Sequence, residues 1–255
     1  MLKLIEQSGN TLHYAVVRFL REKEWTVSIS PYYSDYATDQ SREVDIIAER
    51  LYPIHRSPFD QFVGTINVRL FIECKYLNGE IAFWFDSKNK ANATARITSD
   101  TPLTQDNIYT QKHHYLLDER MAKLFSKKLG SDQDIIHKAL TQVLHVIIYY
   151  KEYHTPSMLL PDCQKILAHL NYPVIICHSF ENFYQVHEDG NEFSRIFENF
   201  QLEVNYTYLS RAGSSKLDYF LIGVVDFNKM ENFLALLEEA DIGAIAQILH
   251  PALWA

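Results

Sequence analysis

The alternation of apolar and polar positions predicts a chain that switches repeatedly between helices and short strands. Helices are predicted for segments 9–24, 109–129, 134–152 and 229–249. Apolar, β-branched runs bounded by turn residues predict strands at 25–30, 43–48, 68–76, 81–85, 172–177, 183–187, 202–208 and 217–226. Segments 31–41 and 86–108 are polar and lack a clear period, which predicts loops, and Asn78-Gly79 is typical of a tight turn before the strand at 81–85.

These elements predict an α/β protein. The chain has 255 residues, a length that fits one large domain or a domain and a half. The short apolar run 172–177 is typical of a central parallel strand that is buried on both faces. We therefore expect a central mixed β-sheet flanked by helices, with residues 1–155 forming its core and residues 156–255 an α/β region that continues the same sheet.

Two of the predicted strands carry charged residues where burial is costly. Asp45 lies in the run 43–48, and Glu73 and Lys75 lie in the run 68–76. An ionised group in a buried strand is unfavourable unless it is paired or bound to a metal. Glu73 and Lys75 are two residues apart and share one face of the strand, and Asp45 joins them if the two strands are neighbours. The sequence therefore indicates two carboxylates for a divalent cation, with an ammonium beside them.

This arrangement resembles the PD-(D/E)xK nuclease superfamily, also called restriction-endonuclease-like. Asp45 takes the place of the lone Asp of the motif, and Glu73-Cys74-Lys75 takes the place of (D/E)xK, while Val44 stands where the name-giving pattern has Pro. The resemblance covers residues 5–85 well and implies a restriction-endonuclease-like core that begins with a helix and three antiparallel strands. The gap between the two motif parts is longer than in a minimal member, so segment 51–64 is expected to be an inserted loop.

The resemblance implies that Asp45 and Glu73 bind Mg²⁺ or Mn²⁺ and that the backbone carbonyl of Cys74 is a third ligand. Lys75 would orient or deprotonate the attacking water, or stabilise charge in the transition state, and the sequence leaves these roles open. The alternative for the whole set is a structural ion pair between Glu73 and Lys75 at a sheet edge.

Three further residues are candidates for an accessory role at this site. Glu43 lies two residues before Asp45, although a solvent-facing position at the frayed strand end is the alternative. Family members often carry an acidic residue on the first helix, and Glu6 is the nearest acidic residue upstream. Gln142 lies on the predicted helix after the core, where the alternative is an amide at the edge of the apolar stripe.

The distribution of charge is uneven along the chain. The net charge of −8 argues against a broadly basic nucleic-acid-binding surface. Between Asp86 and Lys128, however, cationic residues outnumber acidic ones, which predicts either a phosphate-binding stretch or an ordinary solvated face. These cationic residues are Lys88, Lys90, Arg96, Lys112, Arg120, Lys123, Lys127 and Lys128.

The remaining sequence signals mainly exclude other chemistries. The three cysteines are few and lie in apolar strings, which favours reduced thiols in a cytoplasmic protein, and no apolar run reaches the ~18 residues that span a membrane. The eleven histidines form no HExxH or HNH-like motif. His113 and His114 are adjacent, and two neighbouring side chains on a predicted helix cannot both face one ligand, so the histidines are expected to be structural.

The resemblance thus implies a divalent-metal-dependent endonuclease that hydrolyses DNA in restriction, defence against phage or repair. Because the rest of the chain is acidic, we expect that a homodimer or a partner in a larger complex supplies part of the grip on DNA. Three alternatives stay open: an RNA- or tRNA-cutting effector, a partner-activated nuclease subunit of a defence complex, and a catalytically silent nucleic-acid-binding module.

Overall fold

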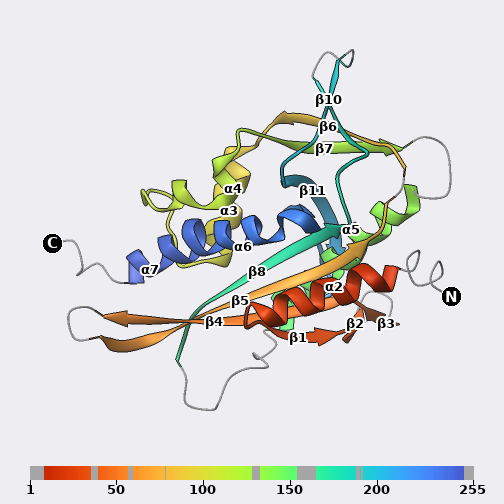
Figure 1. Ribbon diagram of the computed structural model, residues 1–255. Helices are drawn as coiled ribbons and strands as arrows, with labels where there is room; N and C mark the ends of the chain where they lie inside the picture. Colours follow the sequence, from red (N-terminus) through yellow and green to blue (C-terminus); the bar gives the residue numbers. More distant parts are fainter. Residues whose placement is uncertain are drawn as a thin grey trace.

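The computed structural model describes residues 9–35, 40–56, 60–77, 79–127, 133–153, 165–187, 190 and 192–249. Ten strands form one mixed sheet, in the order β1-β4-β5-β8-β12-β11-β7-β6-β9-β10, and helices pack on both of its faces (Figure 1). The prediction of an α/β protein with a large mixed central sheet flanked by helices is therefore confirmed. Strands from both the first half of the chain (within residues 26–29 and 46–127) and the second half (within residues 166–226) lie in this same sheet.

The elements of the first half are α2 (Gly9–Glu22), β1 (Thr26–Ile29), β2 (Tyr32–Asp35), β3 (Gln40–Glu43), β4 (Ile46–Arg56), β5 (Gln61–Lys75), β6 (Ile81–Ser87), α3 (Lys90–Asp100), η1 (Thr110–Lys112), α4 (His114–Leu117) and β7 (Arg120–Lys127). The second half contains α5 (Gln133–Tyr153), β8 (Ile166–Cys177), β9 (Phe183–Val186), β10 (Phe193–Arg195), β11 (Phe200–Leu209), β12 (Ser215–Asp226), η2 (Phe227–Lys229), α6 (Met230–Leu236), η3 (Leu237–Ile242) and α7 (Gly243–Leu249). Strands β2 and β3 form a separate two-stranded sheet.

One end of the large sheet is built from β1, β4, β5 and β8. Strand β4 pairs antiparallel with both β1 and β5, and β8 lies parallel to β5 on its other side. A parallel neighbour requires a crossover connection, and α5 lies in the chain between β5 and β8. This arrangement places the ends of β4 and β5 beside the carboxyl end of β8.

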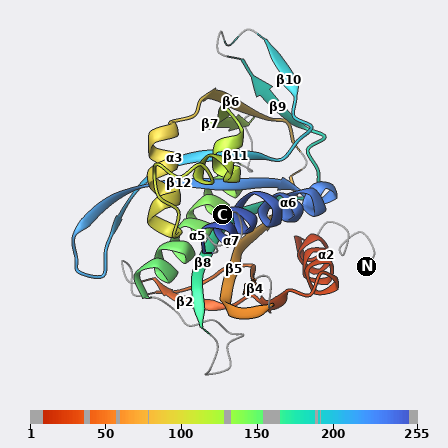
Figure 2. The same cartoon turned by 90° about the vertical axis from the view of Figure 1, so that its left-hand side faces the viewer.

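The alternation of side chains along β5 divides the core into two layers. Leu70 and Ile72 pack in one cluster with residues of α2, whereas Phe71 packs in the other with residues of α5. Helices α2 and α5 therefore cover opposite faces of the sheet, as the two views also show (Figure 2). Glu73 and Lys75 follow Phe71 at even steps, so they belong to the α5 face.

Several predicted elements agree with the structure. The helices at 9–24 and 134–152 correspond to α2 and α5, and the run 172–177 is the buried, parallel end of β8. The helix at 229–249 is interrupted by a π-helical turn, η3, between α6 and α7. None of the helices in the described ranges is long and apolar enough to span a membrane.

Other predicted elements are wrong. Segment 51–64 is not an inserted loop, because its described residues extend β4 and β5 into a long hairpin. Segment 86–108 contains α3, and the end of the predicted helix at 109–129 is strand β7, which lies between β6 and β11. The strand at 81–85 exists as β6, but it pairs with β7 and β9 rather than returning against β5.

Candidate active site

The side chains of Asp45, Glu73 and Lys75 lie together where β4 begins and β5 ends. Asp45 immediately precedes β4, and the main-chain N–H of Asp45 donates to Oε1 of Glu73 over 3.3 Å. The main-chain N–H of Cys74 donates to Oδ2 of Asp45 over 2.8 Å. Nζ of Lys75 lies 2.7 Å from Oε2 of Glu73 and 3.7 Å from Oδ2 of Asp45. Both backbone and side chains therefore connect the three residues.

The three side chains differ in their access to solvent. The side chain of Glu73 is fully buried, that of Lys75 is 16% exposed, and that of Asp45 is 24% exposed. Glu73 thus forms the floor of the site, and Asp45 and Lys75 form its open side. A small ligand approaching from solvent would meet Oδ2 of Asp45 and Nζ of Lys75 first.

Burial and charge change the acidity of both Glu73 and Lys75. Burial, opposed by the ammonium of Lys75 and aided by the negative charge of Asp45, raises the pKa of Glu73 to about 7. Burial by itself lowers the pKa of Lys75, but the charges of Glu73 and Asp45 outweigh it, so the pKa of Lys75 is raised. Lys75 is therefore protonated at neutral pH.

A second buried charge pair lies further along the same two strands. Arg69 on β5 is ion-paired with Glu49 on β4, and both side chains are almost completely buried. Asn67 donates to Oε1 of Glu49 over 3.0 Å, and the guanidinium of Arg69 lies over the ring of Tyr150, 5.4 Å from its centroid. The sequence analysis missed this pair. Glu49 lies four residues after Asp45 and Arg69 lies four residues before Glu73, so the pair shares a face of the sheet with the candidate site.

Two of the predicted accessory residues, Glu43 and Gln142, contact residues other than the three central side chains. Hydrogen bonds from Ser30 and then Tyr32 lower the pKa of Glu43, so its carboxylate lies toward these residues. Nε2 of Gln142 donates to the backbone carbonyl of Glu43 over 3.4 Å, which connects α5 to the segment before Asp45. Glu6 lies outside the described residues.

The predicted basic stretch does not form an open cationic surface over its described side chains. Lys88 is buried and donates to the backbone carbonyl of Tyr115 over 2.6 Å, and burial lowers its pKa to about 8. Three more cationic side chains are paired with carboxylates: Arg96, which is buried, pairs with Asp100, Lys90 with Glu119, and Lys123 with Asp86 and Glu203. Arg120 donates to the carbonyl of Phe85, and Lys112 lies over the ring of Tyr109. The side chain of Lys127 and all of Lys128 lie outside the described part of the chain.

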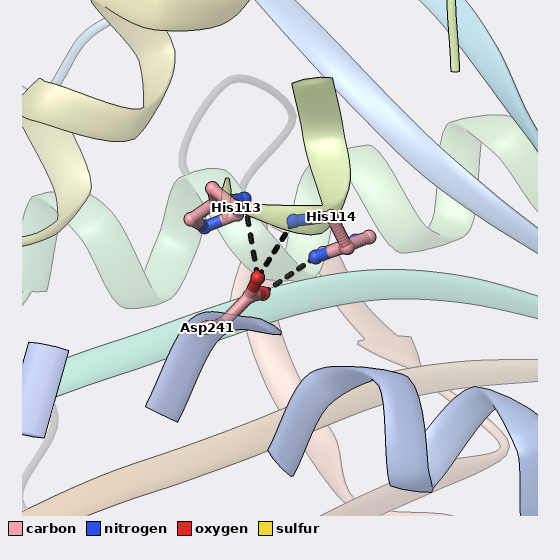
Figure 3. Close-up of side chains that lie close together, drawn as sticks. All are labelled: His113, His114 and Asp241. Carbon is pink, nitrogen blue, oxygen red and sulfur yellow. Dashed lines mark hydrogen bonds and ion pairs between the residues drawn. The ribbon is translucent and has the colours of Figure 1, made fainter. Parts of the chain in front are cut away.

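A buried cluster of His113, His114 and Asp241 corrects the expectation for the adjacent histidines. His113 is not helical, because it precedes α4 in an extended conformation and caps it. Both imidazoles therefore face the same carboxylate: Nδ1 of His113 lies 3.4 Å from Oδ1 of Asp241, and Nδ1 of His114 lies 2.5 Å from its Oδ2 (Figure 3). Asp241 comes from the π-helical turn η3, which a sequence pattern does not reveal.

The three potential ligand atoms of this cluster lie within 4.8 Å of one another, which is close enough for one cation to contact all three. Asp241 and both imidazoles, however, already have hydrogen-bond partners within the protein. The main-chain N–H of His114 and the hydroxyl of Tyr172 also donate to Asp241, over 2.8 Å and 2.7 Å, and Nδ1 of His113 accepts from the N–H of Tyr115. Hydrogen bonding therefore accounts for the cluster without an ion.

Comparison of the chain with protein-family models, with curated proteins and with solved structures found no match. The functional assignment therefore depends on the residues and geometry of the site.

Proposed function

We propose that this chain is a divalent-cation-dependent nuclease and that Asp45, Glu73 and Lys75 form its active site. The observation that carries the proposal is the convergence of these three side chains at the meeting ends of β4 and β5. Two carboxylates with a protonated amine beside them suit the hydrolysis of a phosphodiester, in which negative charge develops on phosphate oxygens. DNA is the proposed substrate, in restriction, defence against phage or repair.

The order of elements around the site supports a restriction-endonuclease-like core. Among the described residues, α2 precedes β1, β4 and β5 in the chain, and β4 pairs antiparallel with both β1 and β5. This is the helix and three-strand order that the superfamily resemblance implies, although the third strand is β1 rather than the strand at 81–85. The proposed site lies where β4 begins and β5 ends.

The residues present fit a hard divalent cation. Carboxylate oxygens are the ligands that Mg²⁺ and Mn²⁺ prefer, and Asp45 and Glu73 supply them from two neighbouring strands. Within an antiparallel pair, the N–H and C=O of one residue point to the same neighbour, so the carbonyl of Cys74 faces the side from which its N–H contacts Asp45. Asp45, Glu73 and this carbonyl would hold the ion, which when bound would polarise the phosphate and activate a water.

The chain's own groups supply the remaining chemistry. The ammonium of Lys75 is held in place by Glu73 and lies on the more open side of the site, near Asp45. A protonated lysine at this position stabilises negative charge on a phosphate oxygen, and it can donate a hydrogen bond to the attacking water.

Cleavage by the purified chain tests the proposal. Supercoiled plasmid and a single-stranded RNA are incubated with Mg²⁺, Mn²⁺ or EDTA, with wild-type protein and with Lys75→Ala. Loss of the lysine should lower the rate by about 10²- to 10⁴-fold. Lys216→Ala is a matched control, because Lys216 pairs with Glu152 and takes no part in the proposed site. Absence of cation-dependent cleavage of either substrate, or equal rates for Lys75→Ala and wild type, contradicts the proposal.

Cutting both strands of a duplex requires two such sites, so we propose that the active form is a homodimer or part of a larger complex. The mass of the protein in solution at the concentration of the cleavage assay tests this part. A monomeric mass together with double-strand cleavage contradicts it.

A further inference from the structure

A hollow of about 490 Å³ lies on the other face of the strand ends that carry the proposed active site. Its walls come from the first turns of α2, from the residues that follow β5 and β8, and from η2. The lining residues are Thr11, Leu12, Ala15, Tyr76, His178, Phe227 and Asn228. A volume in this range is typical of pockets that bind small organic groups.

The hollow and the proposed active site share the carboxyl end of β5. Tyr76 directly follows Lys75, and the main-chain N–H of His178 donates to the carbonyl of Lys75 over 3.2 Å. Because side chains alternate along a strand, Lys75 points to the α5 face and its neighbours point to the α2 face. A nucleic-acid strand that crosses the end of β5 would therefore have its backbone beside Lys75 and a base within reach of Tyr76.

The walls of the hollow are suited to the face of an aromatic ring. The rings of Tyr76 and His178 lie 4.8 Å apart with an interplanar angle of 54°, and Phe227 packs edge-on against Phe19. Leu12 and Ala15 add apolar surface, and Asn228 places polar atoms at the rim, where its Nδ2 lies 3.4 Å from the carbonyl of His178. Aromatic and apolar walls with a few polar groups at the edge are what a nucleobase requires.

The charges of the chain give little support to binding through phosphates alone. Of the cationic residues predicted to contact phosphates, Lys88 and Arg96 are buried, and Lys90 and Lys123 contact carboxylates. The net charge of −8 further weakens attraction to a nucleic-acid backbone. Base stacking does not depend on charge, and it contributes substantially to the binding of single strands.

We propose that this hollow binds an unpaired nucleobase of the substrate strand, next to the bond that the active site cuts. The inference rests on the proposed nuclease function and specifies its substrate class: single-stranded nucleic acid, or a duplex in which one base has left the stack. A base held against the paired rings of Tyr76 and His178 and beside Phe227 would position the adjoining phosphodiester over the end of β5.

Binding of a short single-stranded DNA that contains 2-aminopurine tests this inference. The wild-type protein is titrated in EDTA, so that no cleavage occurs, and stacking of the probe base is followed by quenching of its fluorescence. Tyr76→Ala should weaken binding by about 5- to 100-fold, since a stacked base loses its partner ring, whereas Tyr76→Phe should bind like the wild type. His178→Ala removes an exposed ring and should also weaken binding, which provides a second variant if Tyr76→Ala does not fold.

Phe197→Ala is the control, because Phe197 is 68% exposed and does not line the hollow. This variant should bind the probe as the wild type does. The inference is overturned if the wild type does not quench the probe, if folded Tyr76→Ala and His178→Ala bind like the wild type, or if a fully paired duplex of the same sequence binds as tightly as the single strand. The nuclease proposal fails separately, because it is measured by cleavage with cations and the pocket is measured by binding without them.

Discussion

The main-chain N–H of Cys74 donates to Oδ2 of Asp45 over 2.8 Å, so the middle residue of the Glu-Cys-Lys triplet fixes the carboxylate of the neighbouring strand. The return contact runs from the N–H of Asp45 to Oε1 of Glu73. These two bonds set the relative position of both carboxylates through the backbone. The site is therefore preorganised by the pairing of β4 with β5, and it does not depend on a flexible loop.

Replacing Asp45 with Asn separates the structural role of this side chain from its charge. The Asn carbonyl can still accept from the N–H of Cys74, so the thermal midpoint should stay close to that of the wild type. The affinity for Mn²⁺, measured by isothermal titration calorimetry, should fall by about tenfold or more, because removing even a supporting group of a metal site costs about 10- to 100-fold. Unchanged Mn²⁺ affinity would place the cation elsewhere in the protein.

The buried His113 should make the fold less stable in mild acid. Burial, opposed by Asp241, lowers the pKa of His113 to about 4 in the folded protein, against 6.5 in the unfolded chain. The unfolded chain therefore binds more protons at this residue between pH 6.5 and 4, and the contribution of His113 to the free energy of unfolding should fall as the pH decreases through this window. Glu73, whose pKa is raised to about 7, contributes in the opposite direction, so the His113 contribution is isolated by comparison with a His113 variant. Urea unfolding at several pH values measures this dependence.

His113→Asn is the matched variant for that experiment, because Asn can accept from the N–H of Tyr115 as Nδ1 of His113 does. The free energy of unfolding of the wild type minus that of His113→Asn should decrease as the pH falls from 6.5 to 4. Parallel curves for the two proteins would show that His113 does not titrate as described.

Asp241→Asn should destabilise the protein by about 1–3 kcal/mol, since it removes one of the two oxygens that accept from buried donors. The same substitution also weakens the contact from the hydroxyl of Tyr172. Glu198→Gln is the control, because Glu198 pairs with Lys229 at the surface and should cost less than about 1 kcal/mol. Denaturant unfolding compares the two, and equal small losses would contradict a structural role for the cluster.

Gly64→Ala should destabilise the hairpin of β4 and β5 by about 1–3 kcal/mol. A Cβ at this position would lie 2.6 Å from Cγ of Leu167 and 2.8 Å from the carbonyl oxygen of Lys165. At Gly223 the nearest atom to such a Cβ is 3.5 Å away, so Gly223→Ala is the matched control with a smaller expected loss. Similar free energies of unfolding for both variants would contradict the close approach of β5 and β8.

The convergence of Asp45, Glu73 and Lys75 could be predicted because it depends on two local regularities. Side chains two apart on a strand share a face, and consecutive apolar strands are often neighbours in a sheet. Strand β7 could not be predicted in this way, because its position between β6 and β11 is set by pairings that are distant in the sequence. The predicted helix at 109–129 was wrong for this reason.

Helix α3 was missed because only Ala93, Arg96 and Ile97 of its eleven residues are buried, which is too few for a clear helical period. The contact of His114 with Asp241 joins positions 127 residues apart. Such a contact depends on the whole sheet and on the π-helical turn η3, so local sequence patterns carry no signal for it.

Matched substitutions on β4 and β5 test whether Glu73 belongs to an active site. Glu73→Gln and Glu49→Gln each neutralise a buried carboxylate that is paired with a cationic side chain of β5, but only Glu73 belongs to the proposed active site. Cleavage of plasmid DNA with Mg²⁺ is measured for folded samples of both variants and of the wild type. We predict that Glu73→Gln loses about 10²-fold or more in rate and that Glu49→Gln retains activity. Equal rates for Glu73→Gln and the wild type would contradict the account.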